Sequence, residues 1–153
     1  MPLAKLKEYL DAHGVAYETI PHSQAFTTQE AAAAAHIPGK EVAKTVMVKI
    51  GGRMAMVVLP APDHVSLDRM REVVGEPVEL ATEDEFRSIF PNCEPGAMPP
   101  FGNLWDLQVF VDRRLREDER IAFTAGTHQE LVRLAYGDFE RLVEPVVAQV
   151  ATG

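Results

Sequence analysis

The sequence of 153 residues has one cysteine, one tryptophan and no apolar run long enough to cross a membrane as a helix. A single cysteine excludes an intramolecular disulfide, which fits a reducing compartment. A membrane span needs about 20 apolar residues. The N-terminus also lacks the apolar segment and cleavage site of a secretory signal. These absences predict a cytoplasmic protein with no membrane partner.

Short motifs of several chemistries are missing as well. The five histidines and Cys93 show no metal-ligand spacing, and there is no GxSxG elbow, P-loop or GxGxxG fingerprint. Cys93 stands between Asn92 and Glu94, without a nearby positive charge that could lower its pKa. The sequence therefore predicts neither a metal nor a cofactor, and no nucleophilic thiolate.

The balance of charge is acidic. Lysine and arginine total 15 against 23 aspartates and glutamates, which gives a net charge of −8. Broad binding to nucleic acid normally requires a basic excess, so we expect no DNA partner. Local contact with one nucleotide, or with the end of one strand, stays compatible with this charge.

The elements that are present alternate without repeats or long linkers. A hydrophobic fraction of 46% is enough for one core, and we expect a single domain over residues 1–153. Helical patterns cover residues 3–13, 27–35, 66–74, 82–90 and 130–135, with capping boxes at Thr27–Glu30 and Thr82–Glu85. Strand patterns cover residues 15–20, 42–50, 53–59, 77–80, 107–112 and 120–124, and a short helix and a strand end the chain. This order predicts an α+β fold around one mixed sheet.

Lys44 is the unusual residue of the expected hairpin 42–59, whose Gly51-Gly52 turn tolerates positive φ at both positions. Period-two alternation places Lys44 on the more apolar face of its strand, with Val46 and Val48. A lysine there must reach solvent, pair with a carboxylate or point into a functional cavity. The alternative is that the strand begins near residue 45, so that Lys44 is an ordinary charge at its edge.

The segment Gly96-Ala-Met-Pro-Pro-Phe-Gly-Asn103 suits neither a helix nor a central strand, because it contains two prolines and two glycines. It either connects two elements or presents backbone N–H groups of Gly102 and Asn103 to a ligand. Its composition does not decide between these roles.

Three features in one order resemble the YbaK/EbsC family, whose members are freestanding relatives of the editing domain inserted in bacterial prolyl-tRNA synthetases. They are Lys44 in AKTVMVKI, Gly96-x-x-x-Pro100 followed by Phe101-Gly102, and Gly126-Thr127-His128. The resemblance covers roughly residues 3–150. It implies an α+β fold with a mixed, barrel-like sheet flanked by helices.

The resemblance also implies an activity: metal-free hydrolysis of the ester that joins a wrong amino acid to the 3′ end of a tRNA. Lys44 matches the essential lysine of the family, and Gly96 to Pro100 match the loop that shapes the amino-acid pocket and orients the attacking water. Gly102, which we also expect to be catalytic, and Gly126-Thr127-His128 match segments that line the same cavity. We expect the substrate to contact residues from three segments: Phe26, Thr27, Met98, Phe101, Asn103, Thr127 and His128. An aminoacyl-tRNA synthetase is a further expected partner.

The amino acid that is removed stays open among alanine, cysteine, serine and threonine, because pockets separate small apolar side chains by only about 1–3 kcal/mol per methylene. Two other functions stay open as well. One is a non-catalytic module that binds tRNA or a synthetase, and the other is a hydrolase of a small-molecule ester.

Overall fold

The computed structural model describes residues 2–21, 30, 32–33, 35–91, 93–94 and 96–152. The α-helices named here are α1 (Pro2–Ala12), α3 (Leu67–Val74), α4 (Glu83–Phe86) and α5 (Tyr136–Val143). The strands are β1 (Tyr17–Pro21), β2 (Ala43–Ile50), β3 (Arg53–Pro60), β4 (His64–Val65), β5 (Val78–Leu80), β6 (Gln108–Asp112), β7 (Arg120–Phe123), β8 (Glu130–Ala135), β9 (Val146–Ala148) and β10 (Ala151–Thr152). Short 3₁₀ helices are η1 (Gly39–Glu41), η2 (Gly102–Trp105) and η3 (Arg113–Glu117).

The larger sheet is mixed, as predicted. Its strand order is β5-β2-β3-β6-β9, in which β2 pairs antiparallel with β3 and β5 while β6 runs parallel to β3 and β9. The hairpin β2–β3 is confirmed, and it occupies the inner positions of the sheet. Gly51 and Gly52 join its strands with φ angles of 57° and 86°, which L side chains rarely adopt.

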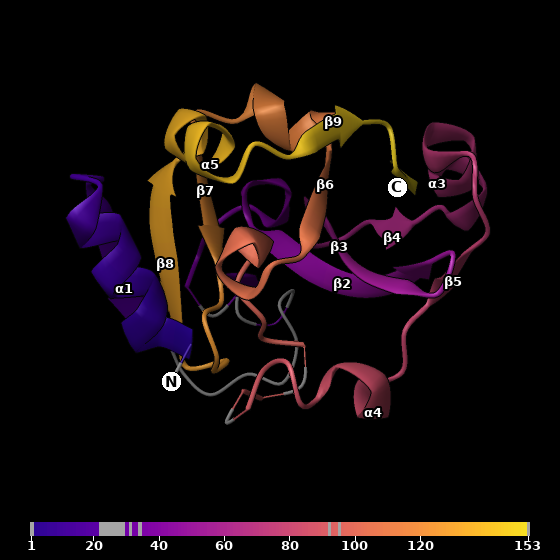
Figure 1. Ribbon diagram of the computed structural model, residues 1–153. Coiled ribbons are helices and arrows are strands. Elements are labelled where there is room, and N and C mark those ends of the chain that lie inside the picture. Colours follow the sequence, from indigo (N-terminus) through magenta and orange to yellow (C-terminus); the bar gives the residue numbers. More distant parts are fainter. Residues whose placement is uncertain are drawn as a thin grey trace.

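A smaller antiparallel sheet has the order β1-β8-β7. One parallel bridge between Val42, just before β2, and Ala122 in β7 connects it to the larger sheet. The strands consequently curve from one sheet into the other, and α1 lies along the outer side of β8 (Figure 1). This arrangement confirms the expected α+β fold with a barrel-like mixed sheet.

The prediction of a helix at residues 130–135 is wrong. The segment is β8, the central strand of the smaller sheet, hydrogen-bonded to β1 on one side and β7 on the other. Leu131, Val132 and Leu134 are all buried, so the strand has apolar contacts on both faces and lacks the alternation of a half-exposed strand. A buried strand of this kind resembles a helical face in a short sequence window.

Helix ends follow local chemistry. The Ser66 hydroxyl accepts a hydrogen bond from the Arg69 N–H at 3.3 Å, and Gly75 ends α3 with a φ of 69°. Helix α4 opens with the predicted capping box but ends at Phe86 instead of residue 90. Pro91 disfavours helical geometry at the residue before it, and the intervening residues form tighter turns.

Other predictions lie partly or wholly outside what the structure describes. The capping box predicted at Thr27–Glu30 falls mostly on residues outside the described ranges. The extent of a single domain, residues 1–153, stays a prediction. Within the described ranges no helix combines the length and the apolar character needed to cross a bilayer.

Candidate functional site

Lys44 is the second residue of β2, where it pairs with Leu59 of β3. The strand begins at Ala43, so the alternative that Lys44 precedes the strand is wrong. Its face is the one that carries Val48 and Ile50, both buried in the core beside α3, whereas Ala43 and Met47 belong to the core on the opposite face. Lys44 thus shares its strand face with buried apolar residues, but the opposite face is buried in a core as well.

The environment of Lys44 disfavours its charge. Burial lowers the pKa of the Lys44 ammonium, and the carboxylate of Asp63 partly offsets this effect. No carboxylate of the described chain lies within ion-pair distance of Lys44; its strand neighbour Lys49, in contrast, pairs with Glu79 and Glu85. Lys44 is therefore a partly buried cation available to an anionic or carbonyl oxygen of a ligand.

Asp63 is itself held in place by charge. Its carboxylate is buried and forms an ion pair with Arg114, whose Nε also donates to Asp112 at 3.1 Å. Asp112 is completely buried. Charges of opposite sign thus alternate from Asp112 in the interior through Arg114 to Asp63, whose charge acts on Lys44. The ion pair with Arg114 fixes the side chain of Asp63.

The loop at Gly96–Pro100 is packed rather than solvated. Ala97, Met98 and Pro100 are buried, while Gly96 itself is exposed and has a φ of 77°. A Cβ atom on Gly96 would lie 3.9 Å from Nε2 of His128, so this imidazole rests against the loop. The positive φ favours glycine at this point, whereas the contact with His128 would leave room for a Cβ atom.

The turn Gly126–His128 is hydrogen-bonded directly to this loop. Gly126 donates its N–H to the carbonyl of Ala97 at 2.7 Å, and Glu94 donates its N–H to the carbonyl of Gly126 at 2.8 Å. The Glu94 carboxylate accepts a hydrogen bond from the N–H of His128 at 2.5 Å. We call these residues, Glu94, Ala97, Gly126 and His128, the loop–turn junction.

The strand pairing brings Lys44 toward this junction. Val42 and Ala122 form a parallel bridge, so the chain runs in the same direction on both sides of it. Lys44 follows Val42 by two residues, and Gly126 follows Ala122 by four. Lys44 and the Gly126–His128 turn therefore both lie beyond the bridge in the same direction. The segments after β7 and after α4 meet at the lower side of Figure 1.

Several predicted contact residues lie elsewhere than expected. Phe101 is completely buried and packs against the rings of Tyr9, Phe123 and Phe139, a position that favours a core role over contact with a ligand. Asn103 donates its amide to the Tyr9 hydroxyl at 3.2 Å, which ties the loop to α1. Their roles in substrate binding stay predictions that these positions do not favour.

Gly102 and Met98 fit the prediction of a shaped loop better. A Cβ atom on Gly102 would lie 2.6 Å from Cγ2 of Val109, so only glycine lets the chain pass at this point. Met98 is buried beside Phe90 and Cys93, next to a small cavity that Glu94 also lines. Thr127 is partly exposed at the turn. Phe26 and Thr27 lie outside the described residues.

Sequence reasoning missed two polar residues of this region. Glu94 is an isolated acid in a loop, and no motif distinguishes it from a solvated charge. Thr45 is buried, and no hydrogen-bond partner for its hydroxyl is present within the described ranges. It lies on the strand face opposite Lys44, where ligand or water could supply the missing partner.

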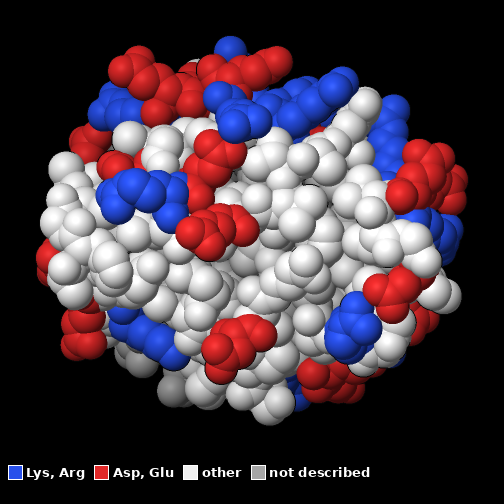
Figure 2. All heavy atoms as spheres, turned by 45° about the horizontal axis from the view of Figure 1, so that its top comes forward, with Lys and Arg blue, Asp and Glu red and all other residues white. Residues whose placement is uncertain are grey.

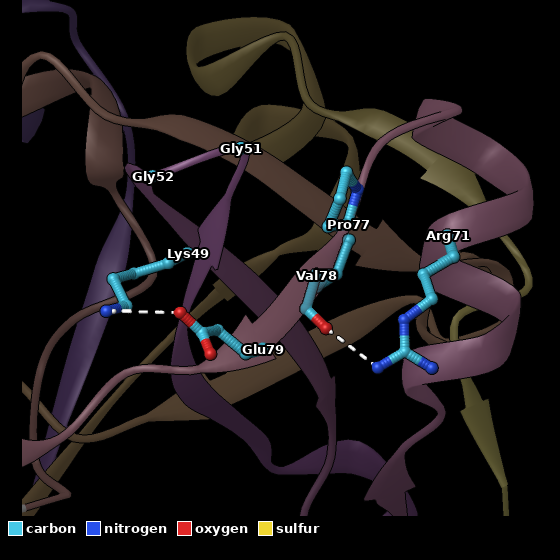
Figure 3. Close-up of a pocket in the computed structure, with 7 residues that line it drawn as sticks. All are labelled: Lys49, Gly51, Gly52, Arg71, Pro77, Val78 and Glu79. Carbon is cyan, nitrogen blue, oxygen red and sulfur yellow. Dashed lines mark hydrogen bonds and ion pairs between the residues drawn. The ribbon is translucent and has the colours of Figure 1, made fainter.

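A separate cavity of about 280 Å³ lies at the tip of the hairpin, lined by Lys49, Gly51, Gly52, Arg71, Pro77, Val78 and Glu79. Figure 3 shows Lys49 directed to Glu79 and Arg71 directed to the carbonyl oxygen of Val78, on opposite sides of the Pro77-Val78 segment. Both cations are already engaged by protein oxygens. This cavity is therefore a weaker candidate than the region of Lys44.

Thiol and metal chemistry receive no support from the described residues. Burial, followed by the charge of Glu94, raises the pKa of the Cys93 thiol to about 11, so the thiol is protonated at neutral pH. Over the described ranges, no three His, Cys, Asp or Glu side chains are grouped so that they could hold one metal ion. A metal-free mechanism stays a prediction.

Comparison with known proteins agrees with this arrangement. The model of the aminoacyl-tRNA editing domain family matches residues 22–142. The proline–tRNA ligase of Macrococcus caseolyticus (strain JCSC5402) is 25% identical over 124 residues, which are 74% of this chain and 22% of the ligase. That of Bacillus cytotoxicus is 31% identical over 85 residues, 55% of this chain and 15% of the ligase. The chain thus spans less than a quarter of the length of these ligases.

Solved structures share the fold over nearly the whole chain. The hypothetical protein APE2540 superposes with a TM-score of 0.86 at 25% identity, covering 97% of this chain and 99% of its own. A proposed trans-editing enzyme for prolyl-tRNA synthetase superposes with a TM-score of 0.82 at 22% identity, covering 98% and 96% of the two chains. The latter likeness shows the fold alone.

Proposed function

Because the chain belongs to the aminoacyl-tRNA editing domain family, we propose that it hydrolyses the ester between a wrongly attached amino acid and the 3′-terminal adenosine of a tRNA. The amino acid is a small one: alanine, cysteine, serine or threonine. The enzyme acts in trans, after a synthetase has released the mischarged tRNA.

One observation carries this proposal: Lys44 is a partly buried cation on an apolar strand face, with no ion-pair partner among the described residues. Placing a charge there costs folding free energy, and an anionic ligand compensates for that cost. The phosphate and carbonyl oxygens at the aminoacylated end of a tRNA supply such partners. Lys44 acts as an electrostatic contact, because its ammonium stabilises negative charge without giving up a proton.

The reaction itself requires little acid–base machinery. A water oxygen attacks the carbonyl carbon, the bond between that carbon and the ribose oxygen breaks, and a proton passes to the ribose oxygen. The products are the free amino acid and the uncharged tRNA. An aminoacyl ester is an activated acyl group, so an ordered water and fixed donors at the carbonyl oxygen suffice.

The packed loop Gly96–Pro100 supports the remaining roles. We propose that this loop, together with Gly102, shapes the amino-acid pocket and orients the attacking water. Thr127 and His128, on the turn bonded to the loop, line the same pocket. The small cavity at Met98 and Glu94 is consistent with a preference for small side chains.

The test is hydrolysis of tRNAs mischarged with alanine, cysteine, serine and threonine, measured for the wild type and for Lys44→Met. Turnover of at least one substrate by the wild type, reduced at least about 100-fold in the variant, is the expected result. Lys49→Met is the matched control, because Lys49 lies on the same strand but on its other face. This control retains activity.

The other outcomes identify other functions. Binding of tRNA without turnover of any substrate indicates a non-catalytic module. Neither binding nor turnover, together with hydrolysis of a small ester such as an amino-acid methyl ester, indicates a small-molecule hydrolase.

A further inference from the structure

Two segments that are distant in sequence form the loop–turn junction, and three hydrogen bonds between the described residues 93–94, 96–97 and 126–128 connect them. Two of these bonds join backbone atoms: Gly126 N–H to Ala97 carbonyl, and Glu94 N–H to Gly126 carbonyl. The third uses a side chain, the Glu94 carboxylate, which accepts from the N–H of His128 at 2.5 Å. Glu94 thus bonds to the turn with both its backbone and its side chain.

The third bond is the strongest of the set by its chemistry. Hydrogen bonds in which one partner is ionised are shorter and roughly twice as strong as neutral ones. His128 is buried, with only 4% of its surface exposed, so water competes little for its N–H. Removal of the Glu94 carboxylate would leave this buried N–H without the acceptor that the structure shows.

The residue that this bond holds also contacts the loop through its imidazole. The ring rests against Gly96, because a Cβ atom on that residue would be 3.9 Å from Nε2 and 4.0 Å from Cε1. Gly96 opens the loop that carries the buried Met98 and Pro100. A displaced turn would therefore move a wall of the amino-acid pocket along with the loop.

We propose that Glu94 is a positioning residue of the deacylation reaction, which fixes the Gly96–Pro100 loop on the Gly126–His128 turn and thereby sets the size of the amino-acid pocket; this inference rests on the proposed function. Glu94 acts through the loop and the turn. Its carboxylate neither attacks the ester nor transfers a proton.

The experiment compares Glu94→Ala and Glu94→Gln with the wild type. Loss of a hydrogen bond to a charged group corresponds to a change of about 10- to 100-fold, so kcat of Glu94→Ala falls by that factor. Glutamine keeps an acceptor oxygen at the same place, and Glu94→Gln recovers most of the rate. Glu72→Ala is the matched control; it removes the same charge from an exposed site on α3 and leaves kcat unchanged.

Two readouts separate positioning from a merely structural role. The ratio of kcat/KM for the alanine and serine esters changes in Glu94→Ala, because the pocket changes shape, whereas general destabilisation lowers both rates alike. The amide proton of His128 resonates far downfield in the wild type, and it moves upfield and exchanges faster in Glu94→Ala. Circular dichroism and the melting temperature establish that both variants are folded.

Two results would overturn the proposal. One is an unchanged ester ratio and kcat in a folded Glu94→Ala. The other is loss of activity that Glu94→Gln does not restore although the His128 amide resonance is retained. If the wild type hydrolyses none of the esters, the proposed function fails, and the positioning role of Glu94 in deacylation fails with it. The exchange rate of the His128 amide then tests only whether Glu94 holds the loop on the turn.

Discussion

At the scale of single residues, burial makes the charge of Lys44 costly to the fold, and the role proposed for this residue in deacylation depends on that same charge. The pKa of Lys44 is lowered by burial, so its folded pKa lies below that of the unfolded chain. The cation is therefore disfavoured in the folded state at neutral pH, and this penalty is relieved as the pH rises through the folded pKa. A residue retained at such a cost fits a functional role.

The first prediction concerns this cost. At pH 7, Lys44→Met has a melting temperature equal to or above that of the wild type, because methionine fills the same space without a buried charge. The advantage of the variant shrinks as the pH rises through the folded pKa of Lys44 toward 10.5. Thermal unfolding followed by circular dichroism at several pH values measures the difference in melting temperature between the variant and the wild type. A large drop in the melting temperature of the variant at pH 7 would mean that Lys44 is needed for the fold.

A second prediction at this scale concerns Asp63, whose carboxylate raises the pKa of Lys44. Asp63→Asn removes that charge, so the pKa of Lys44 falls further and the ammonium is lost at a lower pH. Deacylation that depends on the cation then declines at lower pH than in the wild type. The pH profile of kcat/KM measures this shift of its alkaline limb.

Arg114→Gln serves as the control for Asp63→Asn. It disrupts the same ion pair but keeps the Asp63 carboxylate, so its alkaline limb does not move to lower pH. An equal downward shift in both variants would contradict a direct effect of Asp63 on Lys44.

Among the elements, the loop from Gly96 to Gly102 depends on glycine for two different reasons. At Gly96 the φ of 77° is the constraint, and a β-branched residue there costs about 1–3 kcal/mol of backbone strain. At Gly102 space is the constraint, because a Cβ would lie 2.6 Å from Val109 Cγ2 and 3.3 Å from the carbonyl oxygen of Leu107.

The third prediction follows from this difference. Gly102→Ala lowers the free energy of unfolding by about 1–3 kcal/mol through overpacking, and it lowers the deacylation rate as well. Gly137→Ala, at a helical glycine with open space around it, is the control and does not destabilise the protein. Urea unfolding measures the free energy of unfolding of both variants. A Gly102→Ala protein with the stability and activity of the wild type would show that the loop can shift to make room for the Cβ atom.

The C-terminal strand depends on one carboxylate. Oδ1 of Asp112 accepts hydrogen bonds from the N–H groups of Val150 at 3.0 Å and Ala151 at 3.1 Å, while Oδ2 pairs with Arg114. These bonds attach β10 beside β4. A fully buried carboxylate with this many partners stabilises the fold only while all its partners are present.

As a fourth prediction, Asp112→Ala costs about 3–5 kcal/mol of unfolding free energy, because the backbone N–H groups of Arg114, Val150 and Ala151 lose their acceptor and the Arg114 guanidinium loses one of its two carboxylates. Hydrogen exchange at the amides of Val150 and Ala151 accelerates before other regions are affected. Asp138→Ala, whose partner Arg141 is exposed, is the control and changes stability by less than about 1 kcal/mol. Equal losses in the two variants would refute the special role of Asp112.

At the scale of the whole molecule, the distribution of charge limits how many tRNA phosphates the protein would contact. On the face in Figure 2, basic side chains lie next to acidic ones instead of forming a continuous stripe. Arg116 pairs with Glu140, and Arg141 with Asp138. Together with the net charge of −8, these pairs leave few cations for a phosphate backbone.

The fifth prediction is a shallow salt dependence of tRNA binding. If Lys44 and one neighbour neutralise one or two phosphates, the logarithm of the affinity falls with the logarithm of salt concentration with a slope of about −1. Fluorescence anisotropy with a labelled acceptor-stem RNA between 50 and 300 mM salt measures this slope. A slope several times steeper would show that the protein binds many phosphates along the RNA backbone.

The sequence by itself determined the local features of this protein. The Gly51-Gly52 hairpin, the caps of α3 and α4 and the apolar face of Lys44 all depend on residues close in the chain, so their chemistry can be read there. The order of Lys44, the Gly96–Pro100 loop and the Gly126–His128 turn also identified the family.

Only the tertiary structure decided how distant segments meet. Residues 130–135 form a strand because β1 and β7 satisfy its backbone on both sides, and no local pattern reports such partners. Phe101 belongs to the core because rings from three other elements surround it. Folding also brings the N–H of His128 to the carboxylate of Glu94, and a hydrogen bond between residues 34 positions apart leaves no periodic signal in a sequence.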